Sequence, residues 1–178
     1  ESKDGMLTVT GMLTPGTYRL PGDVSSQFVT GLLYALPLLE GDSEIVLTSP
    51  LESRGYVDMT VEVLGQFGVR VEARPGGWHI PGGQLYQPRS LTVEGDWSQA
   101  AFWYAAMYLS DVNVSGLNFR STQGDRVMAD YFDQFFMGSN DYDVSGCPDL
   151  VPPLAAMAAL CPGGNVTRLI NAARLRLK

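Results

Sequence analysis

The sequence predicts an α/β fold of repeated β-α-β-α-β-β units, with apolar helices inside and sheets outside. Three segments, which begin at residues 18, 91 and 142, resemble one another: each is a short alternating strand, a turn with an aspartate and an apolar helix. Helices 28–39 and 100–109 are apolar nearly all round, which is typical of helices buried inside a domain. The 20 Gly and 11 Pro predict many turns rather than a helical bundle.

The first unit carries every element of this pattern. Alternation of apolar and polar residues marks its strands, and apolar runs between turn residues mark its helices. The predicted elements are a strand and an aspartate turn within 18–23, helix 28–39, strand 44–48, loop 49–55, helix 57–67, and a hairpin of strands 69–73 and 78–80 around a turn at 74–77. Residues 78–80 show the in-out alternation of a half-buried strand.

The later units are shorter. The predicted elements are strand 91–96, helix 100–109 and helix 130–136 in the second unit, and strand 142–144 and helix 154–160 in the third. Asp23 and Asp96 are 73 residues apart, but Asp96 and Asp149 are only 53 residues apart. This shortfall predicts that about 15–20 residues are missing from a gap near 136–141, and that the chain is an incomplete record of a longer repeat protein.

A polar run with a proline, residues 85–90, predicts the boundary between two parts of the chain. This boundary divides the chain into residues 1–90 and residues 91–178.

Composition excludes some classes of function. The net charge of −7 argues against a nonspecific nucleic-acid binder, although a local arginine or lysine can still hold a small anion. The sequence has no signal peptide and no apolar run long enough to span a bilayer, and so predicts a cytoplasmic protein without a membrane partner. Cys147 and Cys161 lack the spacing of a zinc motif; we expect reduced, buried thiols and no metal.

The most informative stretch is residues 21–28, Pro-Gly-Asp-Val-Ser-Ser-Gln-Phe. A Gly-Asp turn leads through two hydroxyls and an amide directly into an apolar helix. Free backbone N–H groups and the helix dipole favour an anion at such a helix N-terminus. The stretch therefore predicts a turn that binds phosphate or carboxylate, while an ordinary serine N-cap is the alternative.

Several motifs together resemble those of the EPSP synthase (3-phosphoshikimate 1-carboxyvinyltransferase) family. They cover nearly the whole chain and are Gly22-Asp23-Val24-Ser25-Ser26-Gln27-Phe28, Ser53-Arg54-Gly55-Tyr56-Val57-Asp58-Met59-Thr60, Val93-Glu94-Gly95-Asp96, Gln123-Gly124-Asp125 and Pro148-Asp149. The resemblance implies a fold of two lobes, with residues 1–90 as part of the first lobe and residues 91–178 as part of the second lobe. It also implies transfer of an enolpyruvyl group from phosphoenolpyruvate to the 5-hydroxyl of shikimate 3-phosphate in the shikimate pathway. It implies no cofactor and, as is usual in the family, a monomer.

The resemblance also implies a set of substrate-binding residues. Ser25, Ser26 and Gln27 match the motif that binds shikimate 3-phosphate, and Ser53 and Tyr56 match the next substrate-binding positions. Taken by themselves, the same residues are also consistent with helix caps and a loop serine.

Two further residues match catalytic positions of the family. Asp149 matches the aspartate that meets the substrate hydroxyl, which makes it the candidate general base, although an N-cap aspartate is the alternative. Lys178 matches a lysine that supplies charge or a proton. Arg174 lies near a substrate-binding position where the residue type differs. A solvated basic strand face is the alternative for Arg174 and Lys178. Asp96 and Gln123-Gly124-Asp125 are interpreted as mainly structural or adjacent to a hinge, with Asp96 as a helix cap.

Other functions remain open at this stage. Ser25-Ser26-Gln27 disfavours the related UDP-N-acetylglucosamine enolpyruvyl transferase of cell-wall synthesis, and retention of all the motif positions disfavours a non-catalytic module with the same repeat fold. An N-terminal lysine and a glycine-rich segment of the family have no counterpart in this sequence. We therefore expect the 178-residue chain to be inactive by itself.

Overall fold

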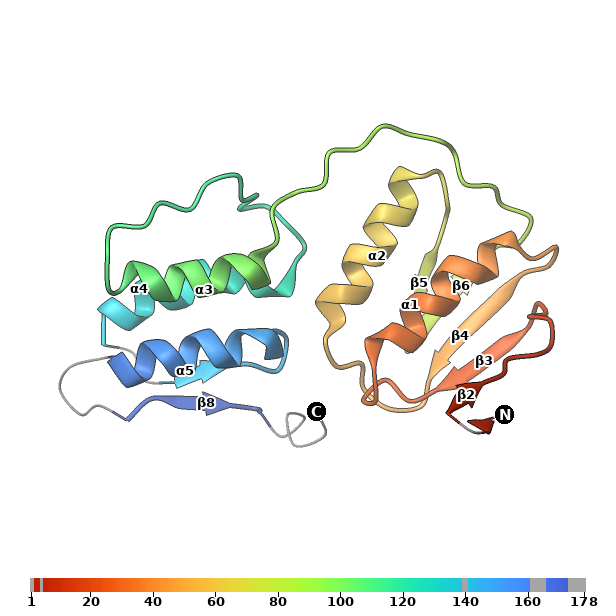
Figure 1. Cartoon of the computed structure of the whole chain (residues 1–178). Coiled ribbons are helices and arrows are strands. Elements are labelled where there is room, and N and C mark those ends of the chain that lie inside the picture. The colour runs from red at the N-terminus through yellow and green to blue at the C-terminus, as the bar shows by residue number, and fades with distance from the viewer. Residues whose placement is uncertain (1, 4, 139–140, 161–165, 173–178) are drawn as a thin grey trace.

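The computed structural model describes residues 2–3, 5–138, 141–160 and 166–172 (Figure 1). The mixed α/β class predicted from the sequence is confirmed. In chain order the elements are β1 (Ser2–Lys3), β2 (Met6–Leu7), β3 (Thr17–Leu20), α1 (Ser26–Ala35), η1 (Leu36–Leu38), β4 (Ser43–Leu47), α2 (Arg54–Gln66), β5 (Glu72–Arg74), β6 (Gly77–Ile80), α3 (Trp97–Met107), η2 (Gly124–Val127), α4 (Met128–Phe136), β7 (Asp141–Asp143), η3 (Pro148–Leu150), α5 (Val151–Leu160) and β8 (Arg168–Ile170), where η marks a 3-10 helix.

The first unit folds in the predicted order, β3-α1-β4-α2-β5-β6. Its four-stranded sheet has the order β3-β4-β6-β5, with β3 parallel to β4 and β6 antiparallel to both β4 and β5. Helices α1 and α2 lie side by side on one face of this sheet (Figure 1). Their buried side chains, among them Leu33 and Leu64, meet Ile45 and Ile80 of the strands in one apolar cluster.

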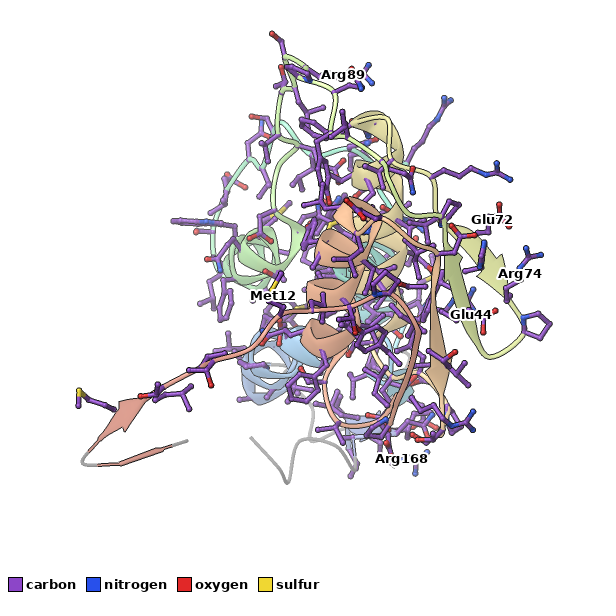
Figure 2. All side chains as sticks on the ribbon, turned by 90° about the vertical axis from the view of Figure 1, so that its right-hand side faces the viewer. Met12, Glu44, Glu72, Arg74, Arg89 and Arg168 are labelled. Atoms are coloured by element: carbon purple, nitrogen blue, oxygen red, sulfur yellow. The ribbon has the colours of Figure 1, made fainter. Side chains whose placement is uncertain are left out.

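The opposite face of the sheet is charged. Glu44, Glu72 and Arg74 point away from the helices (Figure 2). Glu72 forms ion pairs there with Arg70 and Arg74. Alternation along β4 explains the division, because Ile45 points inward to the core between the exposed Glu44 and the half-buried Val46.

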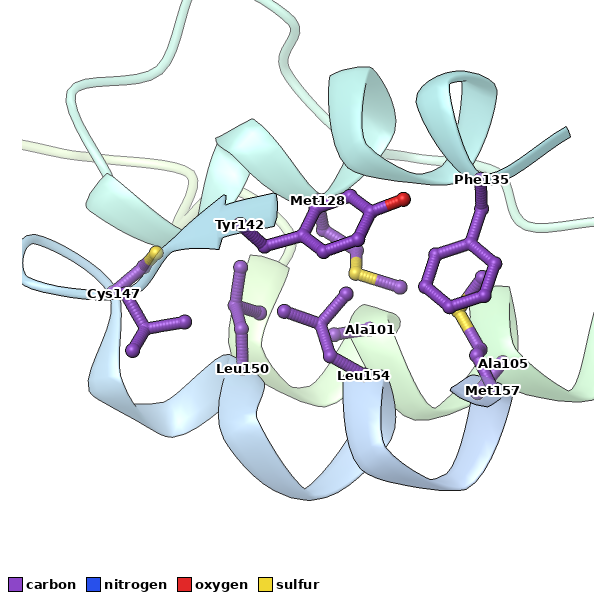
Figure 3. Close-up of a cluster of buried hydrophobic side chains, with 10 residues drawn as sticks. Ala101, Ala105, Met128, Phe135, Tyr142, Cys147, Leu150, Leu154 and Met157 are labelled. Atoms are coloured by element: carbon purple, nitrogen blue, oxygen red, sulfur yellow. The ribbon is translucent and has the colours of Figure 1, made fainter. Parts of the chain in front are cut away.

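The second half packs three helices around another core. Helix α3 lies against α4 and α5, and β7 pairs in parallel with β8. The ring of Tyr142 on β7 stacks on Phe135 of α4 and lies above Leu150 and Leu154 (Figure 3). Cys147 is buried in this cluster with a free thiol, as predicted; Cys161 lies outside the described residues.

Two predictions about this region were wrong. Residues 91–96 form no strand, and Val93 is 84% exposed; a strand needs a neighbour for its backbone N–H and C=O groups, and no described strand lies beside this segment. Helix α3 begins at Trp97, three residues before the predicted start, because the Asp96 carboxylate accepts from the backbone N–H groups of Ser98 and Gln99.

The apolar helices are not covered on all sides within the described residues. Helix α1 buries Val29 and Leu33 but leaves Phe28 57% exposed, and α3 buries Ala101 but leaves Trp103 59% exposed. Each helix packs on only one side here, so the expectation of complete burial is wrong for the described part of the chain.

The two apolar clusters are separate and lie on either side of residues 81–96, which have no regular secondary structure. This separation supports our proposal of a lobe boundary at residue 90. The proposed gap near 136–141 includes residues 139 and 140, which lie outside the described residues. Among the described residues, no helix has both the length and the apolar character needed to cross a bilayer.

Candidate functional site

A cavity of about 610 Å³ lies where the two halves meet, and its lining joins three separate parts of the sequence. The lining residues are Val24, Ser25, Ser26, Gln27, Thr30, Tyr34, Ser53, Tyr56, Met59, Thr60, Pro148 and Asp149. Six of the eight predicted site residues therefore line the same cavity. Lys178 and Arg174, the other two, lie outside the described residues.

Three helix starts converge on this cavity. Helix α1 begins at Ser26, α2 begins at Arg54 next to Ser53, and Asp149 precedes α5. Figure 1 shows these starts facing the centre of the molecule. The starts of α1 and α2 carry partial positive charge from the unpaired N–H groups of their first turns, and neither has an acidic residue there. An anion is therefore favoured in the cavity even though no lysine or arginine is among its described lining residues.

The turn before α1 is fixed against the loop before α2. Ser49 accepts a hydrogen bond from the backbone N–H of Gly22 (2.9 Å) and donates to Asp23 (2.6 Å). A Cβ on Gly22 would lie 2.7 Å from the carbonyl oxygen of Ser49, so only glycine permits this approach. The contact brings the Ser25–Gln27 segment and the Ser53–Tyr56 segment to the same cavity.

The serine pair divides two tasks. Ser25 is the N-cap of α1, and its hydroxyl accepts from the backbone N–H of Gln27 at 3.3 Å. Ser26 is the first helical residue and lines the cavity. The N-cap alternative is thus correct for Ser25, while Ser26 is left as the hydroxyl available to a ligand.

Ser53 adopts a left-handed backbone conformation, with φ of 52° and ψ of 44°, and is almost fully buried. This conformation costs about 1–3 kcal/mol for a residue other than glycine and is concentrated at functional sites. It turns the chain sharply into α2 and directs Tyr56, one turn later, towards the second half of the chain.

Tyr56 joins the two halves through its hydroxyl. The hydroxyl oxygen lies 2.9 Å from Oδ2 of Asp149 and 3.2 Å from Oδ2 of Asp125. Burial, together with these two carboxylates, raises the pKa of Tyr56 well above its ordinary value, so the hydroxyl keeps its proton at neutral pH. The uncharged Tyr56 hydroxyl therefore links Asp149 and Asp125 at the cavity.

Glycines permit this junction. A Cβ on Gly55 would lie 3.1 Å from the nitrogen of Gly124, and a Cβ on Gly124 would lie 2.6 Å from the carbonyl oxygen of Gly146. The backbone segments that contain these three glycines therefore lie in close contact. Gly55 directly precedes Tyr56, and Gly124 directly precedes Asp125. The sequence places glycine at each contact because a larger residue would hold the segments apart.

Asp125 is the most perturbed carboxyl group of the junction. It is 3% exposed, and burial raises its pKa to about 6; the hydrogen bond from Tyr56 opposes this shift, and the charges of Asp149 and Asp96 add to it. The sequence did not predict the contact between Asp125 and Tyr56, because the two residues are 69 positions apart and no local pattern indicates that they meet.

The raised pKa of Asp125 predicts a pH dependence of stability. Between about pH 4 and pH 6, unfolded Asp125 has lost its proton while folded Asp125 keeps it, so its contribution to the free energy of unfolding falls as pH rises. We expect Asp125→Asn to remove this contribution and to raise the free energy of unfolding at pH 7.5 by about 1–3 kcal/mol.

Urea unfolding of both proteins from pH 4 to pH 8 measures the difference. Asp58→Asn is the control, because Asp58 is half exposed and pairs with Arg54 on the same helix as Tyr56. Parallel stability curves for the wild type and Asp125→Asn would contradict the assignment.

Six lining residues were not among the predicted site residues. Val24 and Pro148 are sequence neighbours of predicted residues, Thr30 and Tyr34 follow Ser26 at intervals of four, and Met59 and Thr60 follow Tyr56 by three and four. Helical periodicity counted from Ser26 and Tyr56 could have found the last four. Arg54 lines two neighbouring cavities but not this one.

Comparison with known proteins points to one family. The profile of the family described as EPSP synthase (3-phosphoshikimate 1-carboxyvinyltransferase) matches residues 2–135. The chain is 45% identical to the 3-phosphoshikimate 1-carboxyvinyltransferase of Clostridium kluyveri over 190 residues, covering 97% of the chain and 44% of the relative. It is 43% identical to that of Clostridium acetobutylicum over 194 residues, covering 100% of the chain and 45% of the relative.

The chain thus spans less than half the length of these curated relatives. The alignment to the Clostridium acetobutylicum protein extends over 194 residues, 16 more than the 178 of the chain, so some positions of the relative have no counterpart here. The position of the gap near 136–141 stays a prediction.

Proposed function

This chain belongs to the EPSP synthase family, and from this premise we propose that it forms the shikimate 3-phosphate site of an enolpyruvyl transferase. The enzyme transfers the enolpyruvyl group of phosphoenolpyruvate to the 5-hydroxyl of shikimate 3-phosphate and releases phosphate, a step of aromatic amino acid biosynthesis. The observation that carries this proposal is the convergence of Ser26, Tyr56 and Asp149, from three distant segments, on one cavity at three helix starts.

The chemistry of the lining supports a phosphorylated polyol. The phosphate is held by the Ser26 hydroxyl and the N–H groups at the start of α1, with Ser25 and Ser53 beside it. The Gln27 amide can both donate to and accept from ring hydroxyls. Neutral donors and helix dipoles supply the favourable field, so this half of the site needs no cation.

Asp149 is proposed as the general base. It lines the cavity beside Pro148 and accepts a hydrogen bond from Tyr56. As the substrate hydroxyl adds to the enol carbon C2 of phosphoenolpyruvate, Asp149 takes the hydroxyl proton and C3 receives a proton. The tetrahedral intermediate then loses a proton from C3 and phosphate from C2, which restores the double bond between these carbons.

The family resemblance also supports roles for two basic residues. We propose that Lys178 supplies positive charge or a proton to the reaction and that Arg174 binds substrate. We also propose a cytoplasmic monomer that works without a cofactor, nucleic acid or membrane. The chain spans less than half the length of its curated relatives, and we propose that the 178-residue chain by itself has no turnover.

Ser26→Ala is expected to weaken binding of shikimate 3-phosphate by about 1–3 kcal/mol, or roughly 5–150-fold, because the phosphate loses a hydroxyl partner. Ser26 is the cleaner position to test, since Ser25 also caps α1. Isothermal titration calorimetry on the 178-residue chain measures the change.

The matched control is Ser98→Ala. Ser98 lies in the first turn of α3, where its hydroxyl donates to Asp96 (2.7 Å), and it does not line the first cavity. This variant should bind like the wild type. If Ser26→Ala and the wild type bound shikimate 3-phosphate with equal affinity, the proposed contact between Ser26 and the phosphate would be wrong.

A further inference from the structure

One hydroxyl stands between two carboxylates at the lobe junction. Tyr56 lies within hydrogen-bond distance of Asp149 and of Asp125, at 2.9 Å and 3.2 Å. A tyrosine hydroxyl has a single hydrogen, so it can donate to only one of the two at a time. Both contacts become hydrogen bonds together only when one carboxyl carries a proton and donates it to the tyrosine oxygen.

Asp125 is built to receive such a proton. Its side chain is 97% buried, and its second oxygen, Oδ1, has no hydrogen-bond partner within the described part of the chain. A buried carboxylate oxygen without a donor is costly, and a proton on the carboxyl group lowers that cost.

Tyr56 lines two cavities. It lines the first cavity with Asp149, and with Asp125 it lines a second cavity of about 660 Å³. The second cavity is bounded by α2 and by residues 91–98 and 118–125. A proton that moves from Asp149 through Tyr56 to Asp125 therefore leaves the substrate cavity.

We propose that Asp125 is a positioning residue for the reaction proton, which it receives from Asp149 through the Tyr56 hydroxyl. This proposal rests on the proposed function of Asp149 as general base. It gives Asp125 a role that the family motifs do not assign to it.

The transfer balances without any other reactant. Asp149 first gains a proton as the O–H bond of the substrate hydroxyl breaks. The new O–H group of Asp149 then donates to the tyrosine oxygen, while the original hydrogen of Tyr56 passes to Oδ2 of Asp125. One proton has moved from Asp149 to Asp125, Tyr56 is neutral before and after, and Asp149 is again an ionised base.

The groups that face Asp125 come from several elements. Tyr56 approaches from α2, Asp149 from η3, Asp96 from the start of α3, and Cys147 from the residue before η3. Burial raises the pKa of the Cys147 thiol to about 12, so it stays neutral. The pKa of Asp125, raised to about 6, keeps this carboxyl ionised at neutral pH and makes it a better proton acceptor than an exposed aspartate.

The test follows the carboxyl carbon of Asp125 by carbon-13 NMR during a pH titration of the 178-residue chain. Asp149→Asn should lower the titration midpoint of Asp125, because a nearby negative charge is lost. Tyr56→Phe should raise it, because the hydrogen bond that favours the ionised form is lost. These opposite shifts, each of about half a pH unit or more, are expected only if the three groups are coupled.

Asp58→Asn is the control and should leave the midpoint unchanged. A midpoint of Asp125 that moves with neither Asp149→Asn nor Tyr56→Phe would overturn the proposal, as would a midpoint near the ordinary 3.8 in the wild type. Amide spectra of each variant identify loss of folding, and either informative variant alone decides the outcome by the sign of its shift.

Turnover and ligand binding separate this inference from the proposed function. In the complete enzyme, Asp125→Asn should lower kcat by about tenfold or more with KM for shikimate 3-phosphate unchanged, and should remove a fall in kcat below about pH 6. An unchanged kcat and pH profile would refute the relay. If shikimate 3-phosphate bound normally to the chain while the titration shifts were absent, the relay alone would fail; absence of binding to the wild-type chain would refute the proposed function instead.

Discussion

Gly124→Ala is expected to separate the two halves of the site. A methyl group at this position would lie 2.6 Å from the carbonyl oxygen of Gly146, where neither partner is a flexible side chain that can move aside. To remove this clash, η2 must move away from the segment before η3. This movement carries Asp125, which is part of η2, away from Tyr56. Such overpacking costs about 1–3 kcal/mol of unfolding free energy.

Gly146→Ala is the matched control for this contact. A Cβ at Gly146 would meet no atom within 4 Å, so a methyl group is tolerated on one side of the contact and excluded on the other. Urea unfolding and the NMR titration of Asp125 should both change in Gly124→Ala and stay near wild type in Gly146→Ala. Equal behaviour of the two variants would show that the close approach does not hold the junction.

Trp97→Ala is expected to have the largest effect on stability, about 3–5 kcal/mol, by emptying a fully buried indole site. The Trp97 side chain packs edge-on against Phe119 (5.2 Å between ring centroids), and its indole N–H donates to the carbonyl oxygen of Asn118. Its backbone N–H donates to the side chain of Gln123. The residue thus fixes the loop that leads to Asp125.

Trp103→Ala on the same helix provides the control, because Trp103 is 59% exposed and should cost less than about 1 kcal/mol. Unfolding followed by near-ultraviolet circular dichroism and by urea measures both variants. Because the two apolar clusters are separate, we expect the second half to unfold first in Trp97→Ala while the first sheet persists. A loss below 1 kcal/mol for Trp97→Ala would contradict the role assigned to this side chain.

The fold of the first unit could be predicted because its signals are local. Strand alternation, the Pro75-Gly76 turn and the motif before α1 each lie within a few residues, so the order of the elements along the chain could be predicted. Most residues that line the cavity could be identified as well, since they lie in motifs at helix starts, whereas Thr30 and Tyr34 lie further along α1. The caps at Ser25 and Asp96 are equally local.

The errors concern long-range partners. Residues 91–96 have the pattern of a strand but no described strand beside them, and the apolar residues of α1 and α3 do not reveal which faces are covered. The environment of Asp125 could not be predicted either, because Tyr56 and Asp149, which create it, are distant in the sequence. Pattern and spacing identify the elements; which segments meet is decided by packing between them.

The most direct test of the central claim is a calorimetric titration of the 178-residue chain with shikimate 3-phosphate, with UDP-N-acetylglucosamine titrated in parallel. The convergence of Ser26, Tyr56 and Asp149 on one cavity predicts saturable binding of one shikimate 3-phosphate per chain and no binding of the nucleotide sugar. Saturable binding of UDP-N-acetylglucosamine without binding of shikimate 3-phosphate would contradict the claim.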